Sequence, residues 1–188
     1  MNRIKKLVGE NVYLSPISLD DVELFAKWMN DFSVTDYTNR SDKVYTLEAE
    51  RQWVENEAMK SNYLMSIVTI NNDEVIGNIG FNEINFINRY GVLGILIGEN
   101  ENRNKGYGTE AIRLLLDFAF NYLNLNSVSL RLLECNERAK RCYEKVGFKE
   151  CGRVRKCRYL NGKYYDSIYM DILASEFKGE YIKNKCVR

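Results

Sequence analysis

Two short segments of the chain combine residue types and spacing that could carry chemistry. The first runs Arg103-Asn104-Lys105-Gly106-Tyr107-Gly108-Thr109 and stands directly before an apolar run with helical spacing. The first N–H groups of a helix have no intrahelical partner, and that end of the helix carries a partial positive charge. Glycines would let an anion approach the backbone, and Arg103 and Lys105 add formal charge. The segment therefore predicts an anion site that suits a pyrophosphate.

The glycine pattern alone leaves the guest of this site open. The nucleotide-binding pattern G-x-x-x-x-G-K-[ST] is absent. Gly106 to Ala111 does match G-x-G-x-x-A, which is typical of dinucleotide-binding folds, but in those folds the loop follows its strand tightly. Here seven polar residues, 99–105, separate the loop from a strand expected to end near Gly98. A dinucleotide site is therefore disfavoured, and a loop that only shapes the start of the helix remains the alternative.

The second segment, residues 136–148, begins with Asn136 and has Tyr143 seven residues later. On a helix this spacing puts the amide and the phenol on one face. The chain has no histidine, so Ser-His-Asp and Cys-His nucleophile systems are excluded. Acid–base chemistry must use Tyr, Asp, Glu, Lys, Cys, backbone groups or water.

Composition and cysteine usage narrow the class of protein. The chain has 188 residues, 45% apolar and 28% charged, with a net charge of +1, as in a soluble globular domain that does not seek polyanions such as nucleic acid. Its five cysteines show no C-x-x-C spacing, so we expect reduced thiols, neither a disulfide framework nor a metal site, and a cytoplasmic location. We expect no signal peptide, because the N-terminal residues MNRIKKLVGENVYL contain no adequate apolar region. We expect no membrane contact, because no apolar run approaches the roughly 20 residues that span a bilayer.

Hydrophobic periodicity predicts the elements that would position the two segments. Strands are expected at 12–15, 63–70, 74–85, 91–98 and 127–133, followed by two strands around the hairpin signal Asn161-Gly162. The run 91–98 is apolar throughout, which is typical of a strand buried on both faces. Helices are expected at about 18–30, 47–60, 106–123 and 136–146, with caps at Ser18, Thr46 and Gly147. The order predicts one α/β (α+β) domain over residues 1–188: a mixed sheet of about seven strands with about four helices and a polar tail from 173.

Together the motifs resemble those of the GNAT N-acetyltransferase superfamily. Residues 103–108 are similar to its acetyl-CoA signature [RQ]-x-x-G-x-[GA], and the GILIG strand, residues 136–148 and the final hairpin resemble its other blocks, in order. The resemblance covers about residues 10–172 and is closest to the branch with ribosomal-protein N-terminal and spermidine N-acetyltransferases. It implies a mostly antiparallel sheet and direct acetyl transfer from acetyl-CoA to a primary amine in a ternary complex.

The resemblance also implies roles for individual residues. The strand around Ile95, Leu96 and Ile97 would splay from its neighbour and pair with the pantetheine amides, and the N–H of Leu96 would polarise the acetyl oxygen. Tyr143 would protonate the departing thiolate, since a phenol titrates at about 10 and a thiol at about 8.5. Cofactor contacts are expected from the following residues: Arg103, Asn104, Lys105, Gly106, Tyr107, Gly108, Thr109, Asn136, Lys140 and Tyr143.

The general base and the acceptor are less closely specified. Many family members have an acidic residue where this chain has Val92, so we expect Glu83 to act as the base, through water. No side chain stands out as a covalent carrier, because Cys142 adjoins Tyr143 but faces about 100° away on a helix. Residues 18–60 contain ten Asp or Glu against five Lys or Arg, which would suit a cationic acceptor. Asp31, Asp36 and Glu55 are the candidates for binding it.

Several acceptors and one other class of function remain open. A polyamine such as spermidine or spermine, a protein or peptide N-terminus, an aminoglycoside and an amino sugar all offer a primary amine. Polyamines are the favoured acceptor. A non-catalytic acyl-CoA-binding module is the alternative class, and Asn136 and Tyr143 disfavour it. Exposed sheet edges in such folds often pair, so a homodimer is conceivable.

Overall fold

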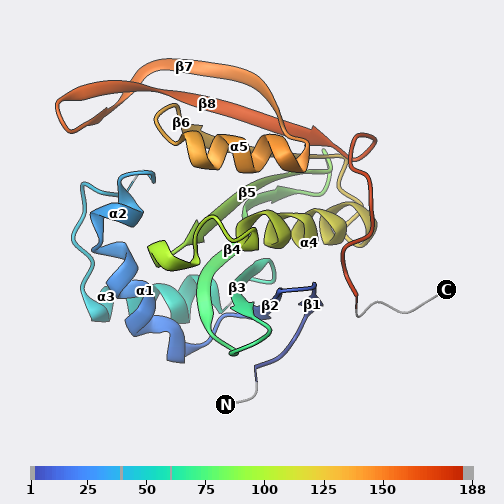
Figure 1. The fold of residues 1–188 in the computed structure, drawn as a ribbon, viewed down its shortest axis with the longest axis horizontal. Coiled ribbons are helices and arrows are strands. Elements are labelled where there is room, and N and C mark those ends of the chain that lie inside the picture. The colour runs from blue at the N-terminus through green and yellow to red at the C-terminus, as the bar shows by residue number, and fades with distance from the viewer. Residues whose placement is uncertain (1–2, 39, 60, 184–188) are drawn as a thin grey trace.

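The computed structural model describes residues 3–38, 40–59 and 61–183, and its centre is one eight-stranded sheet (Figure 1). The strand order is β1-β2-β3-β4-β5-β6-β8-β7, and every neighbouring pair is antiparallel except β5 and β6. The strands are β1 (Leu7–Val8), β2 (Val12–Pro16), β3 (Leu64–Thr69), β4 (Val75–Asn85), β5 (Tyr90–Ile97), β6 (Ser127–Leu133), β7 (Lys149–Leu160) and β8 (Lys163–Leu173). The predicted fold class is confirmed, and β1 is the strand that the sequence did not predict.

Helices cover both faces of the sheet. On one face, α4 (Tyr107–Asn121) and α5 (Glu137–Val146) bury an apolar cluster that includes Leu14, Ile67 and Ile76. On the other face, α1 (Val22–Met29) and α3 (Leu47–Trp53) cover a second cluster, which includes Tyr13, Val68 and Val75. Because side chains alternate along a strand, neighbouring residues of β2, β3 and β4 serve opposite clusters. Within the described residues, no helix is long and apolar enough to span a membrane.

The predicted caps explain where the helices begin and end. Ser18 forms a capping box at the 3-10 helix η1 (Leu19–Asp21), which leads into α1. The Thr46 hydroxyl accepts from the N–H of Ala49, and α3 continues as a π-helical turn, η2 (Val54–Ala58). Gly147 ends α5 with φ of 116°. The expected last residue of the second helix, Lys60, lies outside the described residues.

The segment between α1 and α3 contains a short helix that the sequence did not predict. Residues 31–46 are mostly polar and carry no helical stripe, yet α2 (Phe32–Thr35) forms there. The Asp31 carboxylate accepts from the N–H of Ser33, and Val34 and Thr35 are buried. The Asp31 cap and the two buried side chains therefore contribute to stabilising this single helical turn.

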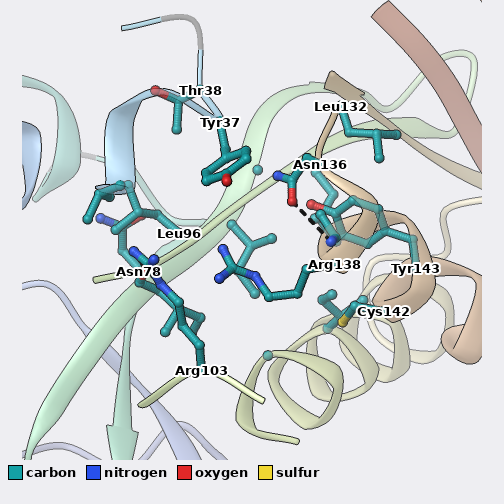
Figure 2. Close-up of a pocket in the computed structure, with 18 of the residues that line it drawn as sticks. Tyr37, Thr38, Asn78, Leu96, Arg103, Leu132, Asn136, Arg138, Cys142 and Tyr143 are labelled. Carbon is teal, nitrogen blue, oxygen red and sulfur yellow. Dashed lines mark hydrogen bonds between the residues drawn. The ribbon is translucent and has the colours of Figure 1, made fainter. Parts of the chain in front are cut away.

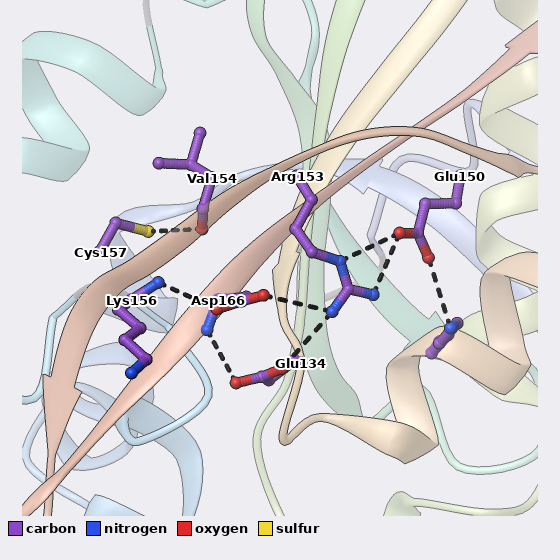
Figure 3. Close-up of polar contacts among 8 residues, drawn as sticks. Glu134, Glu150, Arg153, Val154, Lys156, Cys157 and Asp166 are labelled. Carbon is purple, nitrogen blue, oxygen red and sulfur yellow. Dashed lines mark hydrogen bonds and ion pairs between the residues drawn. The ribbon is translucent and has the colours of Figure 1, made fainter.

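The last two strands form a long hairpin at the edge of the sheet. Its turn, Asn161-Gly162, has φ of 47° and 80°, as the sequence predicted for a tight two-residue turn. Nearly all of β7 is exposed. Arg153 of β7 joins the carboxylates of Glu134, Glu150 and Asp166, so charged groups hold the outer strand to β6 and β8 (Figure 3).

The expected polar tail packs against the core over its described part. The Asp117 carboxylate of α4 is fully buried and accepts from the N–H groups of Tyr181 and Ile182, at 2.6 and 3.0 Å. Ile182 is buried, and the N–H of Lys183 donates to the Val8 carbonyl at 2.8 Å. The sequence predicted a polar tail, whereas apolar side chains such as Ile182 decide how its described part packs. Residues 184–188, including Cys186, lie outside the described part.

The sheet opens between β5 and β6. These two strands pair only where Tyr90, Gly91 and Val92 meet Ser127, Val128 and Ser129. Beyond that point β5 stays with β4 as far as Ile97, and β6 stays with β8 as far as Leu133. The splay implied by the resemblance is therefore present. The expectation that 91–98 is buried on both faces fails for residues 94–97, which are only half-buried because they border the gap.

Candidate active site

A cleft of about 950 Å³ runs through the gap in the sheet and between the helices on either side of it. One half is lined by β5, the glycine loop and α5. The other half is lined by α1, α2, α3, the segment after α2 and Tyr169 of β8. Figure 2 shows Tyr37 and Thr38 on one side, Asn136 and Tyr143 on the other, and Arg138 reaching between them. The first half contains most of the residues predicted to bind a cofactor.

The glycine loop presents open backbone to the cleft. Gly106 begins α4 with φ of 85°, and no side chain caps the helix there. A Cβ at Gly106 would meet no protein atom within 4 Å, and one at Gly108 would only touch Ile95 and Ile97. The space beside the first N–H groups of α4 is thus free for a ligand. Asn104, Tyr107 and Thr109 line the cleft as predicted, whereas the exposed Lys105 does not.

The backbone of β5 supplies hydrogen-bonding groups to the gap. The N–H of Gly98 donates to the Ile76 carbonyl of β4 at 3.0 Å, whereas the Ile97 carbonyl accepts from Arg103. Direction alternates along a strand, so the N–H groups of Ile95 and Ile97 face the gap and that of Leu96 faces β4. The Leu96 N–H was expected to polarise the acetyl oxygen, but only the N–H groups of its neighbours Ile95 and Ile97 face the gap. The Leu96 side chain does line the cleft.

Arg103 does not extend its charge into the space beside the glycine loop. Its side chain is 9% exposed, and its guanidinium donates to the carbonyls of Ile97, Gly98 and Ser33 and to the side chain of Asn100. The phosphate contact expected from this side chain would require breaking those bonds. The motif therefore predicted that Arg103 lies in the cleft wall, but it did not predict which way the side chain points.

Asn136, the N-cap of α5, and Tyr143 within α5 both line the cleft. The Asn136 side chain caps the helix by accepting from the N–H of Ala139 at 3.1 Å. Tyr143 is 8% exposed and packs against Phe148, with ring centroids 6.0 Å apart. Burial raises the pKa of the Tyr143 phenol well above its ordinary value. The hydroxyl therefore stays protonated and is suited to donating a proton or hydrogen bond.

A row of basic side chains on α5 was missed. Arg138, Arg141 and Lys145 line the cleft, whereas the predicted Lys140 pairs with Glu150 at 3.5 Å and does not. Spacings of three and four along the helix could have revealed this row, because they place all three residues near one face. Cys142 also lines the cleft, with its thiol 3.2 Å from the Thr109 hydroxyl, and burial raises its pKa. A raised pKa disfavours the thiolate that a covalent carrier would need.

Glu83 does not occupy the position of a base in this cleft. It is exposed, lies next to an irregularity in β4 and accepts a hydrogen bond from the Tyr90 hydroxyl. Asn82 and Val92 line the cleft, and Glu83 does not. The irregularity shifts the register by one residue, and such a shift turns a side chain to the other face.

The acidic residues predicted to bind an acceptor also lie outside the cleft wall. Asp31 caps α2, Asp36 ends it, and Glu55 is exposed on η2. None of them lines the cleft. Their selection rested on the acidic excess of residues 18–60, and charge counts do not say which way a side chain points.

Glu50 of α3 is the carboxylate that sequence reasoning missed. It is 4% exposed and is the one carboxylate among the described residues that line the cleft. Within the described part of the chain its carboxylate has no hydrogen bond or ion pair. Burial raises the pKa of this carboxyl, with Arg40 acting in the opposite direction. A carboxylate in a cleft wall that makes no hydrogen bond or ion pair can pair with a cation that enters the cleft.

Comparisons with known proteins agree with this geometry. The sequence model of the family described as "Acetyltransferase (GNAT) domain" matches residues 11–149. The chain belongs to the GNAT acetyltransferase family. It is 35% identical over 104 residues to the putative ribosomal N-acetyltransferase YdaF of Bacillus subtilis, covering 55% of this chain and 56% of that one. It is 33% identical over 129 residues to a spermidine N(1)-acetyltransferase of Vibrio cholerae, covering 69% and 66%.

A solved structure extends the likeness to almost the whole fold. The spermidine N-acetyltransferase from Vibrio cholerae in complex with CoA and spermine matches with a TM-score of 0.78 and 26% identity, covering 88% of this chain and 97% of that one. This GNAT chain is therefore an N-acetyltransferase that uses acetyl-CoA to acetylate an amine. Acetyl-CoA supplies the thioester, and the open backbone at Gly106 and Gly108 fits its pyrophosphate.

Proposed function

We propose that this acetyltransferase acetylates small alkyl polyamines, spermidine or spermine, and that Glu50 holds one ammonium group of the acceptor. The observation that carries the proposal is the Glu50 carboxylate in the wall of the acceptor half of the cleft, which makes no hydrogen bond or ion pair within the described residues. A polyamine has one amine to be acetylated and at least one more that stays protonated. Glu50 would pair with the protonated amine. The likeness to spermidine acetyltransferases supports the same class of acceptor.

The cofactor half of the cleft has a distinct part in this proposal. The N–H groups at the start of α4 bind the pyrophosphate, with Arg141 and Lys145 adding charge from α5. The inward N–H groups of Ile95 and Ile97 pair with the pantetheine arm and polarise the acetyl carbonyl. The Tyr143 hydroxyl stays protonated because burial raises its pKa, and it donates a proton to the departing thiolate. The proton that the amine loses on acylation returns to the phenol, so the transfer is balanced.

A protein N-terminus is the second candidate acceptor. Arg40, Arg131 and Arg138 line the cleft alongside the single carboxylate of Glu50. This balance suits an acceptor with one amine and few other positive charges better than it suits a long polycation. The partial likeness to YdaF favours the same candidate. Aminoglycosides, amino sugars and a non-catalytic acyl-CoA-binding role are weaker alternatives.

A panel of acceptors separates these candidates. Thiol release from acetyl-CoA would be followed with spermidine, spermine, peptides with free α-amines, an aminoglycoside and an amino sugar. We expect the highest kcat/KM with a polyamine. Turnover with a peptide α-amine while both polyamines are inert would establish the second candidate. Tight CoA binding with no turnover on any amine would favour the non-catalytic role.

A further inference from the structure

Arg103 connects the two halves of the cleft. Its Nη2 donates to the Gly98 carbonyl at 2.6 Å, and its Nε and Nη2 lie 3.4 and 3.3 Å from the Ile97 carbonyl, at the end of β5. Its Nη1 donates to the Ser33 carbonyl of α2 at 3.1 Å and to the side chain of Asn100 in the 3-10 helix η3 (Asn100–Asn102). One guanidinium thus joins the cofactor strand, the turn before the glycine loop and the acceptor-side helix.

The partners of Arg103 differ from those of Arg153 on the outer hairpin. Arg153 of the outer hairpin binds the carboxylates of Glu134, Glu150 and Asp166 (Figure 3). All of the hydrogen-bond acceptors of Arg103, in contrast, are uncharged oxygens. Burial lowers the pKa of Arg103, so its charge is held at a cost in free energy. A planar guanidinium can donate in several directions at once, which a lysine cannot do. The contacts of Arg103 therefore depend on the several N–H donors of its guanidinium and not on its charge alone.

The segment that Arg103 holds is also fixed by two other arginines. The Arg138 guanidinium of α5 lies 5.7 Å from the centre of the Tyr37 ring. Arg158 of β7 donates to the Ser41 hydroxyl at 3.2 Å and lies 3.7 Å from the Asp42 carboxylate. Three arginines that are far apart in the sequence thus contact Ser33, Tyr37, Ser41 and Asp42. Arg103 is the one that ties them to the cofactor strand.

We propose that Arg103 is a positioning residue that sets α2, and with it the acceptor half of the cleft, relative to the inward amides of β5. Its loss would displace Tyr37 and its neighbours from the thioester while leaving the N–H groups at the start of α4 in place. The effect would therefore fall on the acceptor and not on cofactor affinity. This inference rests on the proposed acceptor site, but its first two readouts below need no acceptor.

The test uses Arg103→Met, Arg103→Lys and the control Arg153→Met. CoA affinity would be measured by calorimetry, backbone deuterium exchange over residues 32–38 without ligand, and acceptor KM at saturating acetyl-CoA. For both Arg103 variants we expect CoA affinity within about threefold of the parent, exchange at 32–38 faster by about tenfold or more, and acceptor KM raised about tenfold. Arg153→Met should leave all three unchanged. Arg103→Lys should fail to rescue, because one ammonium cannot reach Ser33 and Gly98 together.

Two results would overturn the proposal. If Arg103→Met weakens CoA binding about tenfold or more, Arg103→Lys restores it, and exchange at 32–38 is unchanged, then Arg103 acts as a phosphate ligand. If Arg103→Met does not fold, Asn100→Ala removes one hydrogen-bond acceptor of the guanidinium and should give the same pattern at smaller size. Unchanged exchange in Asn100→Ala would also contradict the proposal. Faster exchange without a change in acceptor KM would mean that Arg103 does position α2 but that the proposed acceptor site is wrong.

Discussion

The two halves of the cleft are built on different principles. The cofactor half uses backbone: N–H groups at the start of α4, and the N–H groups of Ile95 and Ile97 where β5 leaves β6. The acceptor half uses side chains that come from α1, α2, α3 and β8, among them Trp28, Tyr37, Glu50 and Tyr169. The backbone geometry of the cofactor half depends on a short glycine pattern. The side chains that line the acceptor half can be substituted one at a time without changing the fold. This difference explains why the cofactor can be inferred from short motifs that follow one another in the sequence and the acceptor cannot.

The largest effect on activity is expected from a substitution of Tyr143, the residue proposed to donate a proton to the reacting thioester. Tyr143→Phe removes the proton donor but keeps the buried ring, so we expect kcat to fall by roughly 10²- to 10⁴-fold. CoA affinity should stay within about twofold, because the pyrophosphate contacts are on backbone elsewhere. Steady-state kinetics and calorimetry would measure the two effects. Tyr159→Phe, on the outer hairpin, is the control, and unchanged turnover in Tyr143→Phe would remove the proposed acid.

The same tyrosine predicts a pH dependence. A general acid works only while protonated, and burial raises the pKa of Tyr143 above its ordinary value. Activity should therefore not decline between about pH 8 and pH 10, the range in which an unperturbed phenol would begin to lose its proton. A falling limb with a midpoint below about pH 9 that disappears in Tyr143→Phe would contradict this assignment.

A smaller effect is expected at the contact between the cofactor strand and the acceptor wall. A Cβ at Gly98 would stand 1.9 Å from the Trp28 ring, whose N–H donates to Glu99 at 3.2 Å. Gly98→Ala should lower the free energy of unfolding by about 1–3 kcal/mol and raise acceptor KM more than it weakens CoA binding. Gly152→Ala is the control, because no atom lies within 4 Å of its added Cβ. A stability equal to that of the control would mean that Trp28 moves freely.

The smallest effect is expected at Glu83. Its carboxylate accepts from Tyr90 outside the cleft, so Glu83→Gln should change kcat/KM by less than about twofold at any pH. The pH–rate profile of the variant measures this directly. A loss of about 100-fold that grows as the pH falls would restore Glu83 as the general base.

How much the sequence predicts differs between the halves for a physical reason. Asn136, Tyr143 and the glycine loop were located because spacing along one helix or loop fixes which residues share a face. Two other features depend on residues that are distant in sequence. The direction of the Arg103 side chain depends on its bond to the Ser33 carbonyl. The bond from Gly98 to Ile76 determines that the N–H groups of Ile95 and Ile97, and not that of Leu96, face the gap. Glu50 could not be told apart from Glu55 by composition, since only the packing of α3 buries one and exposes the other.

That pair of glutamates gives the most direct test of the proposed acceptor site. Glu50→Gln removes the charge from the cleft wall with little change in shape, and Glu55→Gln does the same on the exposed surface nearby. The measurement is kcat/KM for spermidine at saturating acetyl-CoA, with CoA affinity measured in parallel. We predict a loss of about tenfold or more in Glu50→Gln, none in Glu55→Gln, and equal CoA affinity in both. An unchanged kcat/KM in Glu50→Gln, or an equal loss in both variants, would contradict the account.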